Sequence, residues 1–445
     1  MRRAAVAMSN TEDLVAAVPD DVLAICRRLG ERGKRGWVVG GCLRDLLRGK
    51  PVKDWDIATD ARPEEVTELF RKVIPTGIQH GTVTVLIRGE PYEVTTLRGE
   101  GEYLDGRRPE VVVFLDDIID DLARRDFTFN AIALDPLRGD LVDPFGGRED
   151  LAARLVRAVG NARDRFNEDG LRIMRAARFA ARLECAIEEQ TLAAMSDPQC
   201  LDTFAKVSIE RVHDEWLKMM HARQPSIAFE VMFDCGMLAI TCSELARLVD
   251  LPDEGSDNVW QHTLSVVDGC EPDPILRVAA LLHDIAHGET NHAARGAAVA
   301  DRILKRMKFS TRDRERAVHL VRHHAVAYQP DWSDTQLRRW LKDVGAEAAG
   351  DVLRLVRANL PDHADDVGDM ASRVDAILAA KHPLTTRELA LDGKALMSQL
   401  QLKPGRHLGE LLGALLDRVL DDPALNTRDT LLAEARAMVA ERDPG

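Results

Sequence analysis

The stretch "VVGGCLRDLLRGKPVKDWDIATDA", Val38 to Ala61, decides how the first part of the chain folds. An apolar pair runs into two glycines, a helical stretch follows, and Asp54 and Asp56 then stand two residues apart. If "DWDIA" is a strand, its alternate residues share one face, so both carboxylates lie side by side and Trp55 points the other way. The stretch therefore predicts a strand, a helix and a second strand that gathers two negative charges.

Two carboxylates this close are stable when a cation lies between them or when one of them is protonated. Carboxylates bind Mg²⁺ and leave coordination positions for substrate phosphates, and two such ions can hold the attacking and leaving oxygens of a phosphoryl transfer. Gly40 and Gly41 would let the backbone approach a phosphate, and Arg44 follows one turn later as a phosphate partner. The pattern favours a magnesium-dependent transferase; the alternative is a polar turn with two solvated acids.

Length and charge narrow the possibilities further. A chain of 445 residues is expected to hold two to four domains of roughly 100–200 residues each. Its formal net charge is −14, from 60 basic and 74 acidic residues. Such a protein does not hold nucleic acid through its overall field, so any nucleic-acid contact needs a local basic surface.

The cysteines and the apolar runs indicate a cytoplasmic protein. Seven cysteines are scattered without a C-x-x-C pair, which is typical of reduced thiols in a cytosol. Arg2 and Arg3 have no apolar region behind them, so we expect no signal peptide. No apolar run approaches the length of a membrane span, and no membrane partner is expected.

The pattern of elements changes along the chain. Strand-like runs alternate with helical stretches up to about residue 150. Beyond that point the sequence pattern is mostly helical, with polar breaks at 252–257 and 381–389. We expect a multidomain α+β protein whose head is a mixed sheet with helices and whose remainder is all-α. The predicted domains are a head at 15–155, a neck at 156–250, a helical body at 258–380 and a helical tail at 381–445.

Four blocks carry a family resemblance. After G-G-x-x-R-D and D-x-D come "DLARRDFTFNAIALD" (121–135), "LVDPFGGREDL" (141–151) and "EDGLRIMRAARFAARL" (168–183). Together and in this order they resemble the class II nucleotidyltransferases, which include the CCA-adding tRNA nucleotidyltransferases and the bacterial poly(A) polymerases. The resemblance implies a nucleotidyltransferase head with Mg²⁺ on Asp54 and Asp56, and it assigns Arg125 to the bound nucleotide. Glu93, in the alternating "YEVTT", is a candidate third catalytic carboxylate; the alternative is an exposed strand glutamate.

The last block predicts how bases are chosen. On a helix, Asp169, Arg172, Arg175 and Arg178 would form one polar stripe. Cytosine and adenine both present an amino donor beside a ring-nitrogen acceptor, whereas uracil and guanine present the reverse order. An aspartate acceptor beside an arginine donor would therefore match C and A, and unpaired polar groups would penalise U and G. The alternative is a basic solvent face. Gly170 stands where the family usually has proline.

A second set of residues resembles the HD superfamily of metal phosphohydrolases. "LLHDIAHG" (281–288) contains adjacent histidine and aspartate, and further histidines flank it. The resemblance implies an HD body at 258–380 that holds a divalent transition metal or Mg²⁺. The family usually has lysine where this chain has His287. The implied ligands are His262, His283, Asp284, His292 and His324.

The leading hypothesis is template-independent addition of CMP and AMP to the 3′ end of tRNA from CTP and ATP, with release of pyrophosphate. "PTGIQHGTVTV" (75–85) resembles the tRNA enzymes, and the G-R-R-F-R-like stretch of poly(A) polymerases is absent. In the tail, Lys403 and Arg406 could meet RNA phosphates. The alternatives are a poly(A) polymerase, a CC-only or A-only tRNA enzyme, and an HD phosphohydrolase or RNA-binding protein. No obligate protein partner is indicated.

Overall fold

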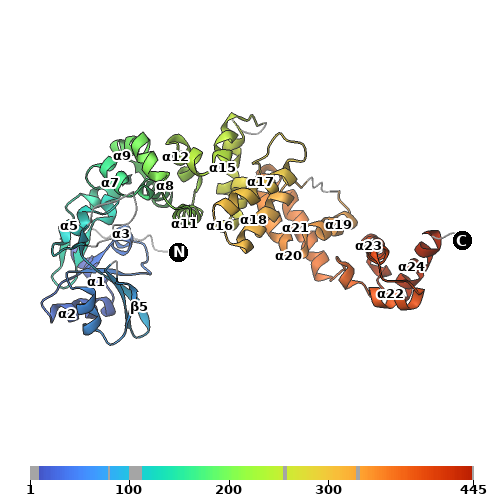
Figure 1. Cartoon of the computed structure of the whole chain (residues 1–445), viewed down its shortest axis with the longest axis horizontal. Coiled ribbons are helices and arrows are strands. Elements are labelled where there is room, and N and C mark those ends of the chain that lie inside the picture. Colours follow the sequence, from blue (N-terminus) through green and yellow to red (C-terminus); the bar gives the residue numbers. More distant parts are fainter. Residues whose placement is uncertain (1–9, 79–80, 100–112, 254–257, 327–330, 443–445) are drawn as a thin grey trace. The chain divides into compact units, whose positions relative to one another are not determined.

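The computed structural model describes residues 10–78, 81–99, 113–253, 258–326 and 331–442. The chain divides into two compact units, residues 1–247 and residues 248–445. The expected fold class is confirmed: a mixed sheet with helices is followed by a region of helices (Figure 1). The finer division into head, neck, body and tail stays a prediction. Residues 79–80 of the tRNA-enzyme-like stretch and 254–257 of the first polar break lie outside the described residues.

A seven-stranded sheet forms the centre of the head. Its strand order is β3-β4-β5-β2-β1-β8-β9, and β2 and β5 run parallel while the other neighbours run antiparallel. This order places β1 and β2 in the middle, next to each other. The strands are β1 (Gly36–Val39), β2 (Asp56–Thr59), β3 (Val73–Gly77), β4 (Thr82–Ile87), β5 (Glu90–Thr96), β8 (Ala133–Asp135) and β9 (Asp140–Val142).

Both faces of the sheet are covered because its central strands are apolar on both sides. Along β1, Val38 belongs to the core beneath one face, and Trp37 and Val39 belong to the core beneath the other. This alternation follows from the two-residue period of a strand. The first core is closed by α1 (Thr11–Ala16), α2 (Asp20–Gly30), α3 (Gly41–Leu47) and α4 (Pro63–Leu69), and the second by α5 (Ile118–Ala123).

The strand predicted for "DWDIA" begins two residues late. The strand β2 starts at Asp56, whose partner in β1 is Val39, the last residue of that strand. The next residue, Gly40, leaves the sheet with a φ of 76°, so β1 offers no backbone partner to Asp54. Trp55 packs against the core as expected. The prediction that both aspartates lie within one strand was therefore wrong for Asp54, which stands before it.

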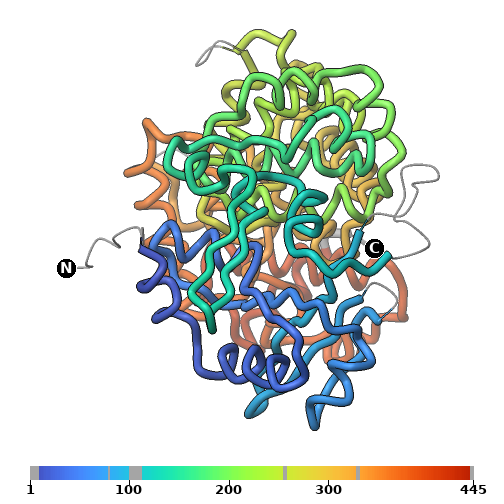
Figure 2. The backbone as a smooth tube through the Cα atoms, turned by 90° about the vertical axis from the view of Figure 1, so that its left-hand side faces the viewer, coloured from blue at the N-terminus to red at the C-terminus, as the bar shows by residue number. Residues whose placement is uncertain are grey.

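Helices follow the head within the same unit, as the tube in Figure 2 shows. The helix α8 is buried along most of its length and packs on α11 and α12. Its Phe179 ring lies 5.6 Å from Phe127 and 5.2 Å from Phe129 of the head, so an aromatic cluster joins the two parts. The helices are α6 (Gly147–Ala152), α7 (Ala162–Glu168), α8 (Leu171–Leu183), α9 (Glu189–Met195), α10 (Pro198–Phe204), α11 (Ile209–Met219), α12 (Ser226–Asp234), α13 (Met237–Thr241) and α14 (Ser243–Ala246).

Two short ladders of two-residue strands lie outside the main sheet. One pairs β6 (Arg98–Gly99) with β7 (Val113–Phe114), and the other pairs β10 (Leu155–Val156) with β11 (Ala186–Ile187). The first is antiparallel and the second parallel. The second ladder links the chain just after α6 to the chain just after α8. It therefore holds the end of α8 against the head.

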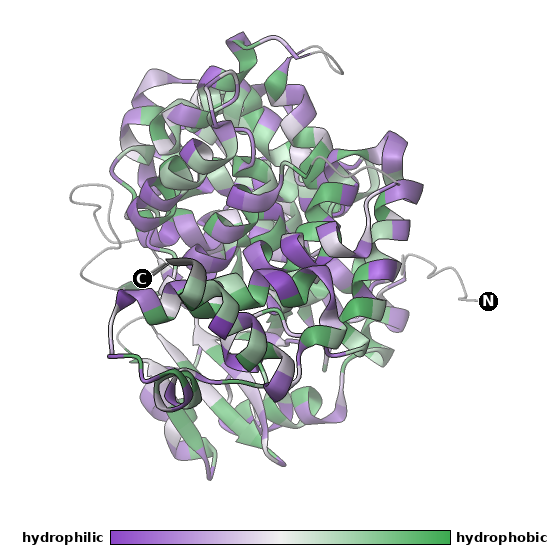
Figure 3. Ribbon diagram, turned by 90° about the vertical axis from the view of Figure 1, so that its right-hand side faces the viewer, coloured by the Kyte–Doolittle hydropathy of each residue, from purple (hydrophilic) through white to green (hydrophobic). Residues whose placement is uncertain are grey.

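The second unit is built of helices in its described residues. Their apolar stripes appear green and their polar stripes purple in Figure 3, as expected for helices that each bury one side. None of the described helices is both long and apolar enough to cross a membrane. The helices are α15 (Val259–Gly269), α16 (Pro274–Leu282), α17 (His292–Arg306), α18 (Thr311–His323), α19 (Asp334–Val344), α20 (Ala346–Asn359), α21 (Ala364–Ala379), α22 (Gly393–Leu400), α23 (Arg406–Asp421) and α24 (Arg428–Arg442).

Candidate active site

The glycine pair joins the end of β1 to the start of α3. Gly40 has φ 76° and ψ −137°, a conformation that side chains other than glycine's rarely adopt. A Cβ built there would lie 3.4 Å from an Asp56 Oδ2 and 3.5 Å from an Arg125 Nη1. Gly40 therefore marks a point where backbone, carboxylate and guanidinium come together.

The three predicted catalytic carboxylates are neighbours. Asp56 pairs in register with Glu93 of β5, and Asp54 precedes it by two residues. The pKa of Asp56 is raised to about 6, chiefly by burial and then by the charges of Glu93 and Asp54, while Arg125 and Arg44 oppose the shift. The group is thus a set of acids whose mutual repulsion a bound cation would relieve. Carboxylate oxygens are the ligands that Mg²⁺ prefers, so these residues fit the ion.

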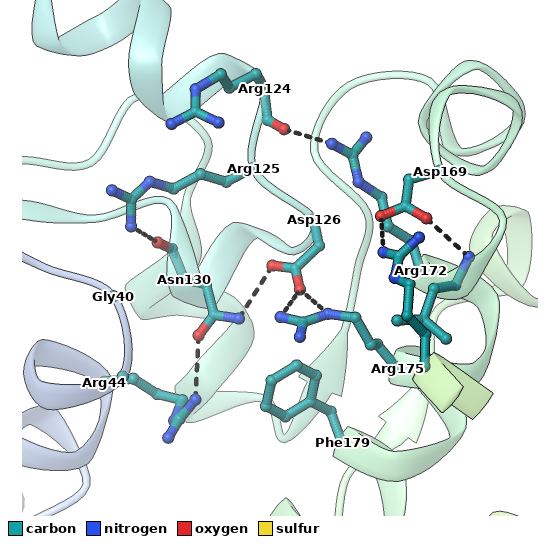
Figure 4. A pocket seen from close by; sticks show the side chains of 13 residues that line it. Gly40, Arg44, Arg124, Arg125, Asp126, Asn130, Asp169, Arg172, Arg175 and Phe179 are labelled. Carbon is teal, nitrogen blue, oxygen red and sulfur yellow. Dashed lines mark hydrogen bonds and ion pairs between the residues drawn. The ribbon is translucent and has the colours of Figure 1, made fainter. Parts of the chain in front are cut away.

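A pocket of about 440 Å³ opens between the head and α8 (Figure 4). Arginines dominate its wall, which suits a phosphate-bearing ligand. The predicted nucleotide-binding residues that line it are Gly40, Gly41, Arg44, Arg125, Asp169, Arg172 and Arg175. The pocket adjoins the carboxylates through Gly40.

Asp126 is the centre of the pocket's hydrogen-bond network. Its Oδ2 accepts from Nε and Nη2 of Arg175 at 2.8 and 2.5 Å, and its Oδ1 accepts from Asn130 Nδ2 at 3.0 Å. Asn130 in turn accepts from Arg44 Nη1 at 3.1 Å through its side chain and from Arg125 Nη1 at 3.0 Å through its backbone oxygen. One buried carboxylate thus fixes three arginines around the cavity, as the dashed lines in Figure 4 show.

The proposed base-selecting pair lies in the same wall, but each member has another partner. The Asp169 carboxylate accepts from Leu171 N at 3.1 Å and from Arg211 Nη2 at 2.7 Å. The Arg172 guanidinium donates to Glu168 Oε2 at 2.6 Å and to the Arg124 backbone oxygen at 2.9 Å. Both groups are therefore held in place before any base arrives.

Arg178 does not share the pocket with the other arginines of its stripe. It is 5% exposed, its Nε donates to Glu215 Oε2, and its guanidinium lies 4.0 Å from the centre of the Phe179 ring. Arg178 was expected to line the nucleotide pocket, but it is not among the residues that line it. Because α11 packs against α8, this part of the stripe faces a neighbouring helix, and Arg178 braces that contact.

The departure at Gly170 has a steric reason. A Cβ built on Gly170 would lie 2.6 Å from the backbone N and Cα atoms of Phe204, at the end of α10. Real Cβ atoms do not approach backbone that closely. Proline, which the family usually has here, would not fit without a shift of α10, so glycine is the residue this packing admits.

In the second unit, the predicted HD ligands converge. His283 Nε2 lies 3.5 Å and His324 Nε2 3.4 Å from the Asp284 carboxylate. His262 joins His283 and Asp284 in one group of possible metal ligands, and His292 joins Asp284 and His324 in another. His323 instead stacks near His319, with ring centres 4.5 Å apart, so the structure separates the two adjacent histidines.

The histidine orientations fit a metal. Nδ1 of His283 lies 2.7 Å from Ala280 O, and Nδ1 of His324 lies 2.7 Å from Val321 O. A backbone carbonyl at that distance places the ring proton on Nδ1 and leaves the Nε2 lone pair toward Asp284. Burial lowers the pKa of His283 to about 4, which keeps this ring neutral. Neutral imidazole is the form that binds metal ions.

Several residues of these sites escaped sequence reasoning. Arg211 contacts Asp169 from a helix 42 residues further on, and Asn359 Oδ1 lies 2.9 Å from His262 Nε2 across 97 residues. Phe179 is flanked by arginines, with Arg44 and Arg175 each 5.5 Å from its centre. No spacing rule in the sequence connects residues so far apart; only helix packing brings them together.

The head and its pocket define the class of the protein: it is a nucleotidyltransferase. The family described as "Poly A polymerase head domain" matches residues 36–157. "Probable RNA and SrmB- binding site of polymerase A" matches residues 185–248, and "tRNA nucleotidyltransferase domain 2" matches residues 292–435. The expected relationship to class II nucleotidyltransferases is confirmed.

Relatives narrow the class to one family. A CCA-adding enzyme of Enterococcus faecalis is 36% identical over 422 residues, 93% of this chain and 94% of that protein. One from Lactobacillus johnsonii is 46% identical over 215 residues, 48% of this chain and 53% of that protein. The crystal structure of the Bacillus stearothermophilus CCA-adding enzyme in complex with CTP matches with a TM-score of 0.77 at 30% identity, over 94% of this chain and 97% of that one. The chain belongs to the family of CCA-adding enzymes.

Proposed function

We propose that this protein adds CMP and AMP to the 3′ end of tRNA, from CTP and ATP, without a nucleic-acid template and with release of pyrophosphate. The observation that carries the proposal is the pocket in which Asp169 and Arg172 stand beside phosphate-binding arginines and next to the carboxylates of β2 and β5. Base-reading groups and phosphate-binding groups thus share one cavity.

Base choice is assigned to Asp169 and Arg172. The carboxylate accepts a hydrogen bond from the amino group of C or A, and the guanidinium donates to the neighbouring ring nitrogen. Arg211 holds the Asp169 carboxylate and Glu168 holds the Arg172 guanidinium, so both groups are oriented before a base binds. Preorganised polar groups reject a mismatched base strongly, because a buried donor or acceptor then stays unpaired.

The triphosphate is assigned to Arg44, Arg125 and Arg175. Arg44 and Arg125 both donate to Asn130, and Arg175 donates to Asp126. These hydrogen bonds hold the three positive charges at fixed positions around the cavity. Because guanidinium groups bind phosphate oxygens in two places at once, such a fixed set orients the chain of phosphates.

The carboxylates Asp54 and Asp56 would hold Mg²⁺, and Glu93 supports them as a third negative charge. Bound there, the ion supplies Lewis-acid stabilisation of the charge that develops during phosphoryl transfer. A Cβ at Gly40 would lie 3.4 Å from an Asp56 Oδ2, so the missing side chain keeps this carboxylate open to the α-phosphate and the attacking 3′-hydroxyl.

The tRNA body is assigned to the helical tail. Lys403 and Arg406 are exposed beside Pro404 and Gly405 at the start of α23, where they can meet phosphates. We also place the protein in the cytoplasm, since its seven cysteines are buried and free. A local basic surface is needed because the formal net charge of the chain is −14.

Product sequencing tests the proposal and its alternatives. The full-length protein is incubated with tRNA that lacks its last three residues, with CTP alone, ATP alone, or both. Addition of C, C and A in order is expected. A CC-only enzyme would stop before the A, an A-only enzyme would extend only tRNA that ends in CC, and a poly(A) polymerase would add a run of A. No addition under any condition would overturn the proposal.

A second proposed function rests on the histidine cluster. We infer that the cluster around Asp284 binds a divalent transition metal or Mg²⁺ and supports phosphoester hydrolysis. Support comes from the Nδ1 contacts, which turn the Nε2 atoms of His283 and His324 toward the Asp284 carboxylate, where an ion would bind. Metal content after dialysis, measured for the wild type and for His283→Ala with Asp284→Ala, tests binding; equal content would contradict the site.

A further inference from the structure

A second cavity of the first unit has no part in the chemistry described above. Its volume is about 860 Å³, compared with about 440 Å³ for the nucleotide pocket. The end of α3, the region from Asp143 to Arg154 and the end of α8 enclose it. The volume lies within the usual range for small-molecule sites.

The cavity lies at the far ends of the two helices that build the nucleotide pocket. Gly41 and Arg44 of α3 line that pocket, whereas Leu47 and the following Arg48 line the second cavity. In α8, Arg172 lines the pocket and Leu183 the second cavity. The two cavities share no lining residue and are therefore separate sites.

Basic side chains surround the cavity. Arg48, Lys50, Arg148 and Arg154 are among its lining residues. Lys50 and Arg154 are exposed, and their side chains have no hydrogen-bond or ion-pair partner within the part of the chain that the structure describes. Unpaired cations at the mouth of a cavity favour an anionic ligand.

The acidic lining residues are largely engaged elsewhere. The Asp143 carboxylate accepts from the backbone N–H groups of Gly147 at 2.7 Å and Arg148 at 3.0 Å, which fixes the start of α6. The Glu184 carboxylate lies 3.6 Å from an Arg223 nitrogen. Glu149 is the third acidic residue of the lining. The four basic residues therefore outnumber the three acidic ones, two of which already have partners.

Arg48 lies against the end of α8, where its Nη2 donates to the Leu183 backbone oxygen at 3.3 Å. The floor beside it is apolar, with Leu47, Leu151 and Leu183.

We propose that this cavity, between α3, α6 and the end of α8, binds a second nucleotide, with its phosphates on Lys50, Arg48 and Arg154 and its base on the leucine floor. The combination of cations with an apolar surface fits a molecule that carries both phosphates and a ring. A nucleic-acid backbone would use the cations but leave the enclosed apolar floor empty.

Equilibrium dialysis with the α,β-methylene analogue of ATP, which cannot be transferred, tests the site. The wild-type protein should bind a second equivalent beyond the one in the nucleotide pocket. Lys50→Glu with Arg154→Glu should weaken that second equivalent at least about tenfold. Lys72→Glu with Lys206→Glu reverses the same charge at exposed lysines outside both cavities and should change nothing.

Two further arms separate the possible outcomes. Asp54→Ala with Asp56→Ala should weaken binding in the nucleotide pocket and keep the second equivalent, so failure of the proposed active site would be seen independently. A single equivalent on the wild type would overturn the inference. The inference would also be overturned if Lys50→Glu with Arg154→Glu bound nucleotide as the wild type does but lost tRNA affinity tenfold in fluorescence anisotropy. That result would assign the cavity to RNA phosphates.

Discussion

Arg211→Ala should impair the choice of bases although Arg211, which lines the pocket, makes neither of the two hydrogen bonds assigned to the base. Arg211 Nη2 donates to Asp169 Oδ2 at 2.7 Å, and Leu171 N holds the other oxygen at 3.1 Å. Without Arg211 the carboxylate keeps its charge but loses one of its two anchors. It should then spend less time in the orientation that accepts from the amino group of C or A.

The size of the effect follows from the ion pair. A hydrogen bond between charged groups contributes about 1.5–3 kcal/mol. The Arg211 and Asp169 side chains are 31% and 25% exposed, so solvent screening reduces this to about 1–2 kcal/mol. The kcat/KM for CTP and ATP should therefore fall roughly 5- to 30-fold, and UTP and GTP should change less.

Single-turnover incorporation of each of the four nucleotides onto tRNA that lacks its last residues measures this selectivity. Arg163→Ala is the matched control, because Arg163 lies in the same unit and forms an ion pair with Asp197 at 3.2 Å, outside the nucleotide pocket. Asp169→Ala alone should lower discrimination by roughly 1–3 kcal/mol. In that background, Arg211→Ala should lower it no further, since the two residues act as one unit.

Two results would refute this reasoning. If Arg211→Ala slows all four nucleotides by the same factor, it does not act through the base-reading carboxylate. If the effects of Arg211→Ala and Asp169→Ala on selectivity add in the double variant, Arg211 does not influence base choice through its ion pair with Asp169. An effect equal to that of Arg163→Ala would likewise leave Arg211 without a role in base choice.

Three further outcomes are expected. Asp56→Asn should abolish addition of both C and A while tRNA still binds in a gel-shift assay, because asparagine is not an anionic ligand for Mg²⁺; normal CMP incorporation would contradict the metal site. Asp126→Asn should cost about 2–4 kcal/mol in urea unfolding at pH 7, since it leaves Arg175 without its buried partner. Burial raises the pKa of Asp126, but Arg175 and Asn130 outweigh this and lower it to about 2, so the difference should be fully present above about pH 4 and shrink as pH falls toward 2; a difference that grows on acidification would exclude this origin. His283→Ala with Asp284→Ala should leave nucleotide addition near wild type and remove any phosphatase or cyclic-phosphodiesterase activity; collapse of addition in a protein with normal circular dichroism would mean that the two sites are not independent.

The sequence by itself determined the class of the protein and the chemistry of its head. The glycine pair, the closely spaced aspartates and the ordered blocks lie within short stretches, because each serves a local need for a tight turn or a shared face. These features could be predicted because the residues that act together are close in the chain or repeat with the period of one element. The histidines around Asp284 come from separate helices, so their grouping was predicted from the resemblance to the HD superfamily and not from local spacing.

Only the tertiary structure decided which partner each of these residues meets. The same three-residue spacing placed Arg175 in the pocket and Arg178 against Glu215, because α11 packs on one part of α8. Packing also selected glycine at position 170, where α10 leaves no room for a Cβ, and supplied Arg211 to hold Asp169. Spacing along one helix fixes which side chains share a face, but contacts between helices depend on the summed burial of whole surfaces, which no single motif encodes.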